Sequence, residues 1–89
     1  MQVQFIYGSQ IHSRAQLHEF LAERLALPGY YGNNLDALYD CLSSHNTNLE
    51  LIVTETDSLH KHLSSYGESF LRVLKDAAVE NHSFHLKIR

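Results

Sequence analysis

Two aspartates one helical turn apart, Asp36 and Asp40, have the types and spacing best suited to recognition chemistry in this sequence. They lie in LDALYDCL at 35–42, where 100° per residue places them and Tyr39 opposite an apolar stripe. Like charges at i and i+4 cost a helix roughly 0.2–0.5 kcal/mol. A solvated surface helix gains nothing evident from that pairing, so this face is a candidate binding surface. The stripe consists of Leu35, Leu38, Cys41 and Leu42.

The segment before this helix favours a functional interpretation. Two aspartates on an exposed helix are most often only a solvated face, and Asp36 also suits the first turn, where the helix dipole favours an anion. Asp40 lies a full turn further on and has no such explanation. The preceding turn, PGYYGNN at 28–34, combines tyrosines with glycine and asparagine, and Asn34 is a good N-cap. Aromatic and small polar side chains on a rigid turn are typical of recognition surfaces.

Residues 25–42, LALPGYYGNNLDALYDCL, resemble the signature of the barstar family, the intracellular inhibitors of secreted barnase-type ribonucleases. The similarity is nearly residue for residue at 25–28, 30–32, 34–38 and 40–42. It extends more weakly through the chain, at Gly8, Gln10, Ile11, Leu17, His18, Glu23, Gly67, Glu68, Ser69, Leu71, Val73 and Ala77. We therefore expect residues 1–89 to form a single barstar-like domain.

The resemblance implies a mechanism, which is mimicry of the RNA phosphate. In this family the helix that matches 35–42 enters the active site of the ribonuclease, which is rich in basic side chains. Carried over by position, Asp40 would occupy the phosphate site and accept charge-assisted hydrogen bonds from arginine. Asp36 would pair with further basic groups, and Asp76 would add a peripheral charge. The other expected contacts are Tyr30 over the catalytic histidine, Gly32, Asn34 and Leu35 at close backbone approach, and Tyr39 at the rim.

Three departures from the family pattern bear on the identity of the partner. Tyr39 stands where the family has tryptophan, and this chain has no tryptophan at all. The following loop has His45 where a second tryptophan is expected, and Asp76 replaces a glutamate. Because rim residues set specificity, we expect a basic microbial ribonuclease with a different surface, or a related toxin domain. The alternative is a non-inhibitory barstar-fold module that binds another basic partner.

Composition and charge limit the other functions. The 89 residues are 44% hydrophobic with a net charge of −3, which disfavours direct nucleic-acid binding and suits a basic protein partner. No apolar run approaches the ~20 residues of a membrane span, and no signal peptide pattern is seen. The single cysteine, Cys41, excludes an internal disulfide and should be a reduced core thiol. We expect a cytoplasmic protein with no membrane partner.

Catalytic and metal sites have little support. Seven histidines are many for this length, but His60 and His62 are two residues apart, and His82 and His85 lack a metal-ligand spacing. No nucleophile elbow or phosphate-binding loop is present. A convex, open helix face does not give two aspartates the environment that general acid–base catalysis needs. We expect no enzyme activity, no cofactor and no metal, and a metal-binding or enzymatic domain would depend on the histidines alone.

Hydrophobic periodicity predicts three strands, at 2–7, 49–54 and 83–88. The second should be buried, and in the third Phe84, Leu86 and Ile88 alternate with His85 and Lys87. Each connection between strands is long enough for parallel pairing. The predicted fold class is therefore α/β, a small three-stranded parallel sheet covered by about four helices.

Four helices are expected between these strands. The first should begin at Ser13, with Gln16 completing a capping box, and be stopped by Pro28 and Gly29. The acidic helix follows. A short helix capped by Asp57 or Ser58 should break at Gly67, and a longer one should end near Asn81.

Overall fold

The computed structural model describes residues 2–29, 31–44 and 48–89, which contain three strands, a 3-10 turn and four α-helices. The three strands form one parallel sheet in the order β1-β2-β3, which confirms the predicted α/β fold class. In chain order the elements are β1 (Gln2–Tyr7), the 3-10 turn (Gly8–Gln10), α1 (Arg14–Arg24), α2 (Leu35–Ser44), β2 (Leu49–Thr54), α3 (Thr56–Leu63), α4 (Ser65–Glu80) and β3 (Phe84–Ile88).

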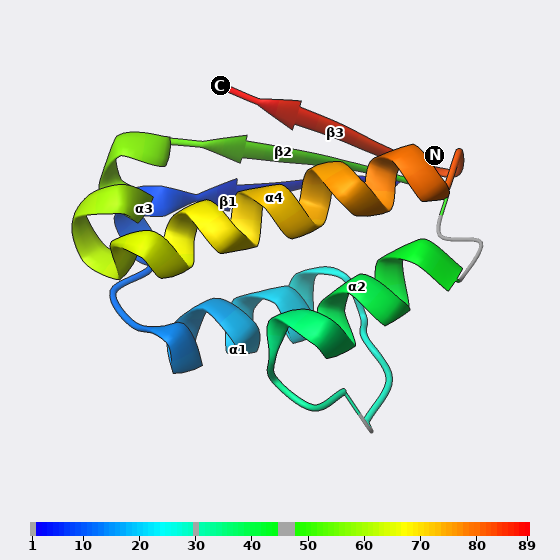
Figure 1. The fold of residues 1–89 in the computed structure, drawn as a ribbon, viewed down its shortest axis with the longest axis horizontal. Helices are drawn as coiled ribbons and strands as arrows, with labels where there is room; N and C mark the ends of the chain where they lie inside the picture. The colour runs from blue at the N-terminus through cyan, green and yellow to red at the C-terminus, as the bar shows by residue number, and fades with distance from the viewer. Residues whose placement is uncertain (1, 30, 45–47) are drawn as a thin grey trace.

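Helices α1, α2 and α4 lie on one side of the sheet, and α3 lies at the end toward which the strands point (Figure 1). α4 packs against β3, α3 and α2, and α1 packs against β1. The core fills the space between these layers, and each fully buried aliphatic or aromatic side chain there stabilises the fold by roughly 1.5–3 kcal/mol. Its largest apolar members are Ile6, Ile11, Leu17, Leu21, Leu38, Leu42, Leu51, Leu59, Phe70, Leu74 and Phe84.

The sheet is most deeply buried at its centre. β2 pairs with a strand on each side, and Leu51 and Val53 are both 0% exposed, as predicted for the second strand. β3 is an edge strand and its burial falls along its length. Phe84 is 2% exposed, whereas Ile88 is 38% exposed, although both belong to the apolar positions of the alternating strand. An edge strand has a neighbour on one side only, and its far end has less to pack against.

α1 begins and ends with recognisable caps, although not quite those predicted. The hydroxyl of Ser13 accepts a hydrogen bond from the N–H of Gln16 at 3.1 Å, but the side-chain oxygen of Gln16 accepts from the N–H of His12 at 2.7 Å. The capping box is therefore displaced by one residue. The helix ends at Arg24, ahead of Pro28, because Ala26 takes up a left-handed conformation with φ 51° and closes a Schellman motif.

The junction of α3 and α4 differs from the prediction at both helix starts. α3 begins at Thr56, since Glu55 is its N-cap with φ 61°, so neither Asp57 nor Ser58 caps it. The break after α3 falls at Ser64, with φ 54°, and Gly67 lies inside the first turn of α4. A Cβ at Gly67 would lie 3.1 Å from the carbonyl oxygen of Leu59. Glycine is needed there for close approach of the two helices, not for a turn.

Candidate functional site

The start of α2 is fixed by the side chain of Asn34. Its Oδ1 accepts a hydrogen bond from the N–H of Ala37 at 2.8 Å, and its Nδ2 donates to the carbonyl of Gly32 at 3.2 Å. The first bond confirms Asn34 as the N-cap, because it satisfies a helix N–H that has no acceptor within the helix. The second ties this cap to the loop, so that loop and helix start form one hydrogen-bonded unit.

The loop residues beside this cap have local reasons for their identities. A Cβ on the exposed Gly32 would lie 3.1 Å from Nδ2 of Asn34, so a larger residue would press on the amide that holds the cap. Asn33 has φ 56°, in the left-handed region that asparagine tolerates better than most residues. Tyr30, which we expect to pack against the partner, lies outside the described residues.

α2 is amphipathic in the way its sequence predicts. Leu38 is 0% exposed and Leu42 is 1% exposed, and Cys41 is also buried. Asp36 and Asp40 are exposed, and their i, i+4 spacing places both on the same side of the helix. The structure therefore brings two carboxylates to one surface of a helix whose opposite face is anchored in the core.

The two remaining predicted contacts on α2 are only partly accessible. Leu35 and Tyr39 are both half-buried and pack against the core cluster. Tyr39 thus offers a partner less area than a fully exposed ring would. Its predicted contribution to the rim of an interface is accordingly smaller than that of the two carboxylates.

The last predicted contact, Asp76, is exposed on α4, the helix that packs against α2. The two helices run side by side in the same direction (Figure 1). Nδ2 of Asn81, just after α4, donates to the carbonyl of Leu42 at 2.6 Å and joins the carboxyl-terminal ends of both helices. Asp76 is thus held on a neighbouring element, as a peripheral charge would be.

Cys41 behaves as the buried thiol that the sequence predicts. It is the single cysteine of the sequence, and it is 7% exposed. Burial raises the pKa of its thiol, and the negative charge of Asp40 adds to this effect. Because the thiolate is the reactive form of cysteine, both influences keep Cys41 unreactive.

A buried histidine near this surface was missed by the sequence reasoning. His18 is 2% exposed, and its Nδ1 and Nε2 are hydrogen-bonded to the hydroxyls of Tyr31 and Tyr66, the latter at 2.7 Å. The signal was present, because His18 follows Leu17 and precedes Leu21 by three residues and so belongs to the buried side of α1. Burial lowers the pKa of His18 and raises the pKa of both tyrosines.

A cavity of about 470 Å³ opens between α1 and the loop that precedes α2. The guanidinium of Arg14 lies over the ring of Tyr66, 4.3 Å from its centroid, as in a cation–π contact. Polar and charged side chains from three parts of the chain meet here. The lining residues are Arg14, Ala15, His18, Glu19, Asn33, Asn34 and Tyr66.

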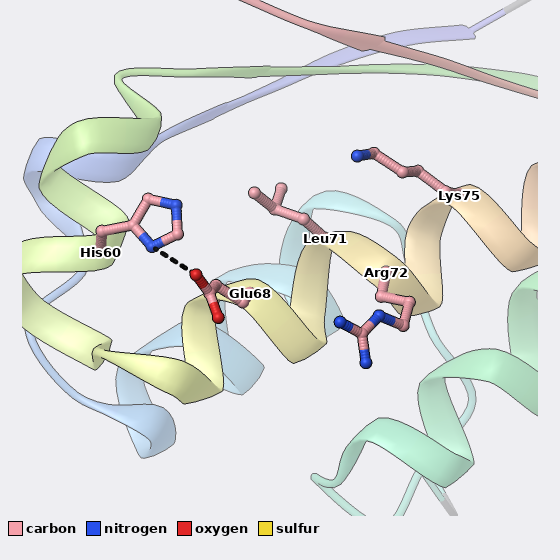
Figure 2. Close-up of a pocket in the computed structure, with 5 residues that line it drawn as sticks. All are labelled: His60, Glu68, Leu71, Arg72 and Lys75. Carbon is pink, nitrogen blue, oxygen red and sulfur yellow. Dashed lines mark ion pairs between the residues drawn. The ribbon is translucent and has the colours of Figure 1, made fainter.

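A second pocket, of about 350 Å³, lies on the surface of α3 and α4 (Figure 2). Nδ1 of His60 is 3.9 Å from a carboxylate oxygen of Glu68, and both side chains are largely exposed. Leu71, Arg72 and Lys75 complete the lining. Because two of its lining residues are basic, this pocket is distinct from the acidic surface of α2. An exposed ion pair such as His60–Glu68 adds little stability.

Two further observations concern other classes of site. Among the described residues, no group of three or more histidine, cysteine, aspartate or glutamate side chains is arranged to hold a metal ion. Within the same part of the chain, no helix combines the length and apolar character needed to cross a bilayer.

The fold and the surface together define a small α/β protein in which helices back a parallel sheet and one of them presents an acidic face. Residues 1–89 match the family described as "Barstar (barnase inhibitor)", and the chain therefore belongs to the barstar family. It is also similar to a protein of Bacillus subtilis (strain 168) named "Putative ribonuclease inhibitor YrdF", with 36% identity over 76 residues, 84% of each chain.

Proposed function

We propose that this protein inhibits a basic microbial ribonuclease, of the barnase type or a related toxin domain, by placing the acidic face of α2 in the active site of the enzyme. One observation carries the proposal. Asp36 and Asp40 are exposed one turn apart on α2, a helix whose other face is buried, in a chain of the barnase-inhibitor family. The relative from Bacillus subtilis has the name of a ribonuclease inhibitor, which supports the same role.

The proposed chemistry is substitution of a carboxylate for a phosphate. A ribonuclease must hold the RNA phosphate with arginine, lysine or histidine, and a carboxylate can accept the same charge-assisted, bidentate hydrogen bonds. Asp40 occupies the phosphate site in this proposal, and Asp36 pairs with further basic groups of the cleft. The anchored helix reaches the enzyme already ordered, so little conformational entropy is lost on binding.

The other predicted contacts surround these two carboxylates. Gly32, Asn34 and Leu35 let the enzyme approach the backbone at the start of α2, and Asp76 adds charge from α4. Tyr30 packs on the enzyme, and Tyr39 covers the rim. We place this action in the cytoplasm, where an inhibitor would meet the ribonuclease before its secretion.

Inhibition of a panel of barnase-type ribonucleases and toxin domains, measured by cleavage of a fluorogenic RNA, tests this function. Asp40→Asn keeps the shape of the side chain and removes its charge. We expect it to weaken inhibition by about 2–5 kcal/mol, because basic groups of the enzyme are left buried without a partner. Asp57→Asn is the matched control, since Asp57 is an exposed aspartate in the first turn of α3. Equal inhibition by both variants would refute phosphate mimicry.

A second candidate function is binding of another basic partner without inhibition of a ribonuclease. The half-burial of Tyr39 and the absence of tryptophan favour it, because both reduce the aromatic area at the rim. Capture experiments with the same panel separate the two functions. A ribonuclease that is captured through Asp40 and yet remains fully active would support the second function and overturn the first.

A further inference from the structure

His18 connects three elements that are far apart in the sequence. It lies in the middle of α1, and its two ring nitrogens reach Tyr31 in the loop before α2 and Tyr66 at the start of α4. Tyr31 is itself only 8% exposed. A chain of three polar side chains thus spans the space between the helices, with His18 and Tyr31 buried and Tyr66 half-buried. Buried polar groups of this kind are costly unless every member is satisfied.

The chain ends next to the proposed binding surface. The N–H of Tyr31 donates to the carbonyl of Pro28 at 2.9 Å, which shapes the turn. The next residue, Gly32, accepts the hydrogen bond from Asn34 that joins the loop to the helix cap. Only Gly32 and Asn33 separate Tyr31 from Asn34, the N-cap of α2. A movement of the Tyr31 side chain would therefore shift the Asn34 N-cap of α2.

The protonation state of His18 decides whether this chain of hydrogen bonds is satisfied. A neutral imidazole has one donor and one acceptor nitrogen, so one tyrosine hydroxyl donates to it and the other accepts from it. An imidazolium has two donors, and both hydroxyls must then accept. The hydroxyl that donated to the neutral ring must then turn its proton to another acceptor. For the buried Tyr31 that acceptor has to lie inside the protein, whereas Tyr66 lines the cavity. Burial already lowers the pKa of His18, in accord with a site built for the neutral ring.

We propose that His18 is a positioning residue for partner binding, which holds the 31–34 loop and the start of α2 in their binding shape through Tyr31 and Tyr66 while its ring is neutral, and releases them when the ring takes up a second proton. This inference depends on the proposed function for its binding consequence, whereas its structural part concerns the free protein alone. No contact between His18 and the partner is needed, since the effect passes through Tyr31.

The charged and titratable neighbours of this chain come from each element packed around it. Arg14 and Glu19 of α1 line the cavity beside His18, and Arg14 lies over the ring of Tyr66. Cys41 of α2 acts electrostatically on Tyr31. Arg14 and Glu19 bring opposite formal charges, and burial raises the pKa of the Cys41 thiol. Histidine is the side chain in this cluster whose ordinary pKa, 6.5, lies between pH 5 and 8, and burial lowers the pKa of His18 from that value.

His18→Gln provides the sharpest test, because glutamine keeps a donor and an acceptor but cannot take up a proton at these pH values. We expect the dissociation rate of the ribonuclease complex to rise about tenfold for the parent protein between pH 7.5 and 5.5, about 1.4 kcal/mol, and to rise much less for His18→Gln. Comparing both proteins with one enzyme removes the titration of the enzyme itself. His62→Gln is the matched control, since His62 bonds the carbonyl of Ile11 on another part of the molecule.

The free protein supplies an independent measurement, by NMR, of the backbone amides at 31–34 and, for comparison, in β2. We expect the loop amides to shift and exchange faster as the pH falls in the parent protein, and to remain unchanged in His18→Gln. Tyr66→Phe removes only one hydroxyl, and should loosen the same amides at pH 7.5 and weaken binding about tenfold. It serves as the second variant where His18→Gln does not fold.

The two measurements separate failure of this inference from failure of the proposed function. A loop that follows the protonation of His18 in a protein that binds no ribonuclease of the panel would support positioning and overturn the function. If neither a change of pH nor Tyr66→Phe alters the amide signals of residues 31–34, the positioning role of His18 would be overturned, whatever the protein binds. Equal pH dependence of dissociation in the parent and in His18→Gln would likewise overturn it.

Discussion

Leu38→Ala tests whether α2 is anchored firmly enough to present a fixed acidic face. Leu38 is 0% exposed and belongs to the core cluster. The change removes three buried carbon atoms, each worth about 0.8 kcal/mol of transfer free energy, or about 2.4 kcal/mol together. The cavity that remains adds to this loss, so we expect a total of about 3–4 kcal/mol. For a domain of this size the melting temperature should fall by roughly 12–30 °C.

Urea and thermal denaturation followed by far-UV circular dichroism would measure this loss. Val79→Ala on α4 is the control, because Val79 is 74% exposed and should change stability by at most about 0.5 kcal/mol. A loss below about 1 kcal/mol for Leu38→Ala would mean that the site collapses easily or that α2 is loosely packed. The rigid presentation of Asp36 and Asp40, on which the proposed inhibition depends, would then be refuted.

Three further predictions concern charge. Asp36→Ala should leave the free energy of unfolding within about 0.5 kcal/mol of the parent value, since relief of repulsion from Asp40 offsets a lost dipole interaction; an unfolded variant in a thermal melt would show that Asp36 is structural. In stopped-flow mixing with a cognate ribonuclease, association should slow as salt rises, and Asp76→Ala should lower the association rate while Asp40→Ala raises the dissociation rate. Association indifferent to salt would speak against an acidic interface. Burial lowers the pKa of His18 below its ordinary 6.5, so below about pH 6.5 the unfolded chain binds more protons than the folded chain. The stability that His18 contributes is therefore complete above about pH 6.5 and should fall as the pH drops below that value. As the pH is lowered below about 6.5, the urea midpoint of unfolding should fall more for the parent protein than for His18→Gln. An equal fall in both proteins would contradict a lowered pKa for His18.

Most of the scaffold could be predicted because hydrophobic period and chain length leave few alternatives. The strand at 49–54 is apolar almost throughout, as a buried strand should be, and connections of this length between strands favour parallel pairing. The order of the strands in the sheet could not be predicted from these patterns. The errors fall where tertiary contacts override local preference. Ser64, not Gly67, has the positive φ between α3 and α4, and Gly67 instead allows the close approach of α4 to Leu59. No local pattern shows whether a glycine is needed for a turn or for the close approach of two helices.

The candidate surface could be predicted in part, also from the hydrophobic period. Period alone places Asp36 and Asp40 opposite Leu38, and Asn34 has both the residue type and the position of a cap. Their roles in binding remain predictions. The hydrogen-bonded chain through His18 could not be predicted, because its members are separated by 13 and 48 residues and meet only when the helices pack.

The exposed charges of α2 and the groups that hold this helix in place should affect binding in different ways. The charges that would meet an enzyme lie on the exposed side of α2, where each contributes little to stability. The groups that hold them in place are buried or half-buried: the apolar face of α2 on one side, and the chain from Tyr66 through His18 to Tyr31 on the other. A partner's basic cleft can therefore select among sequences that differ at the exposed charges without disturbing the fold. Changes at the buried chain act differently, because they alter the shape in which every one of those charges is presented. The first kind of change should retarget such a protein, and the second should weaken its binding to all partners alike.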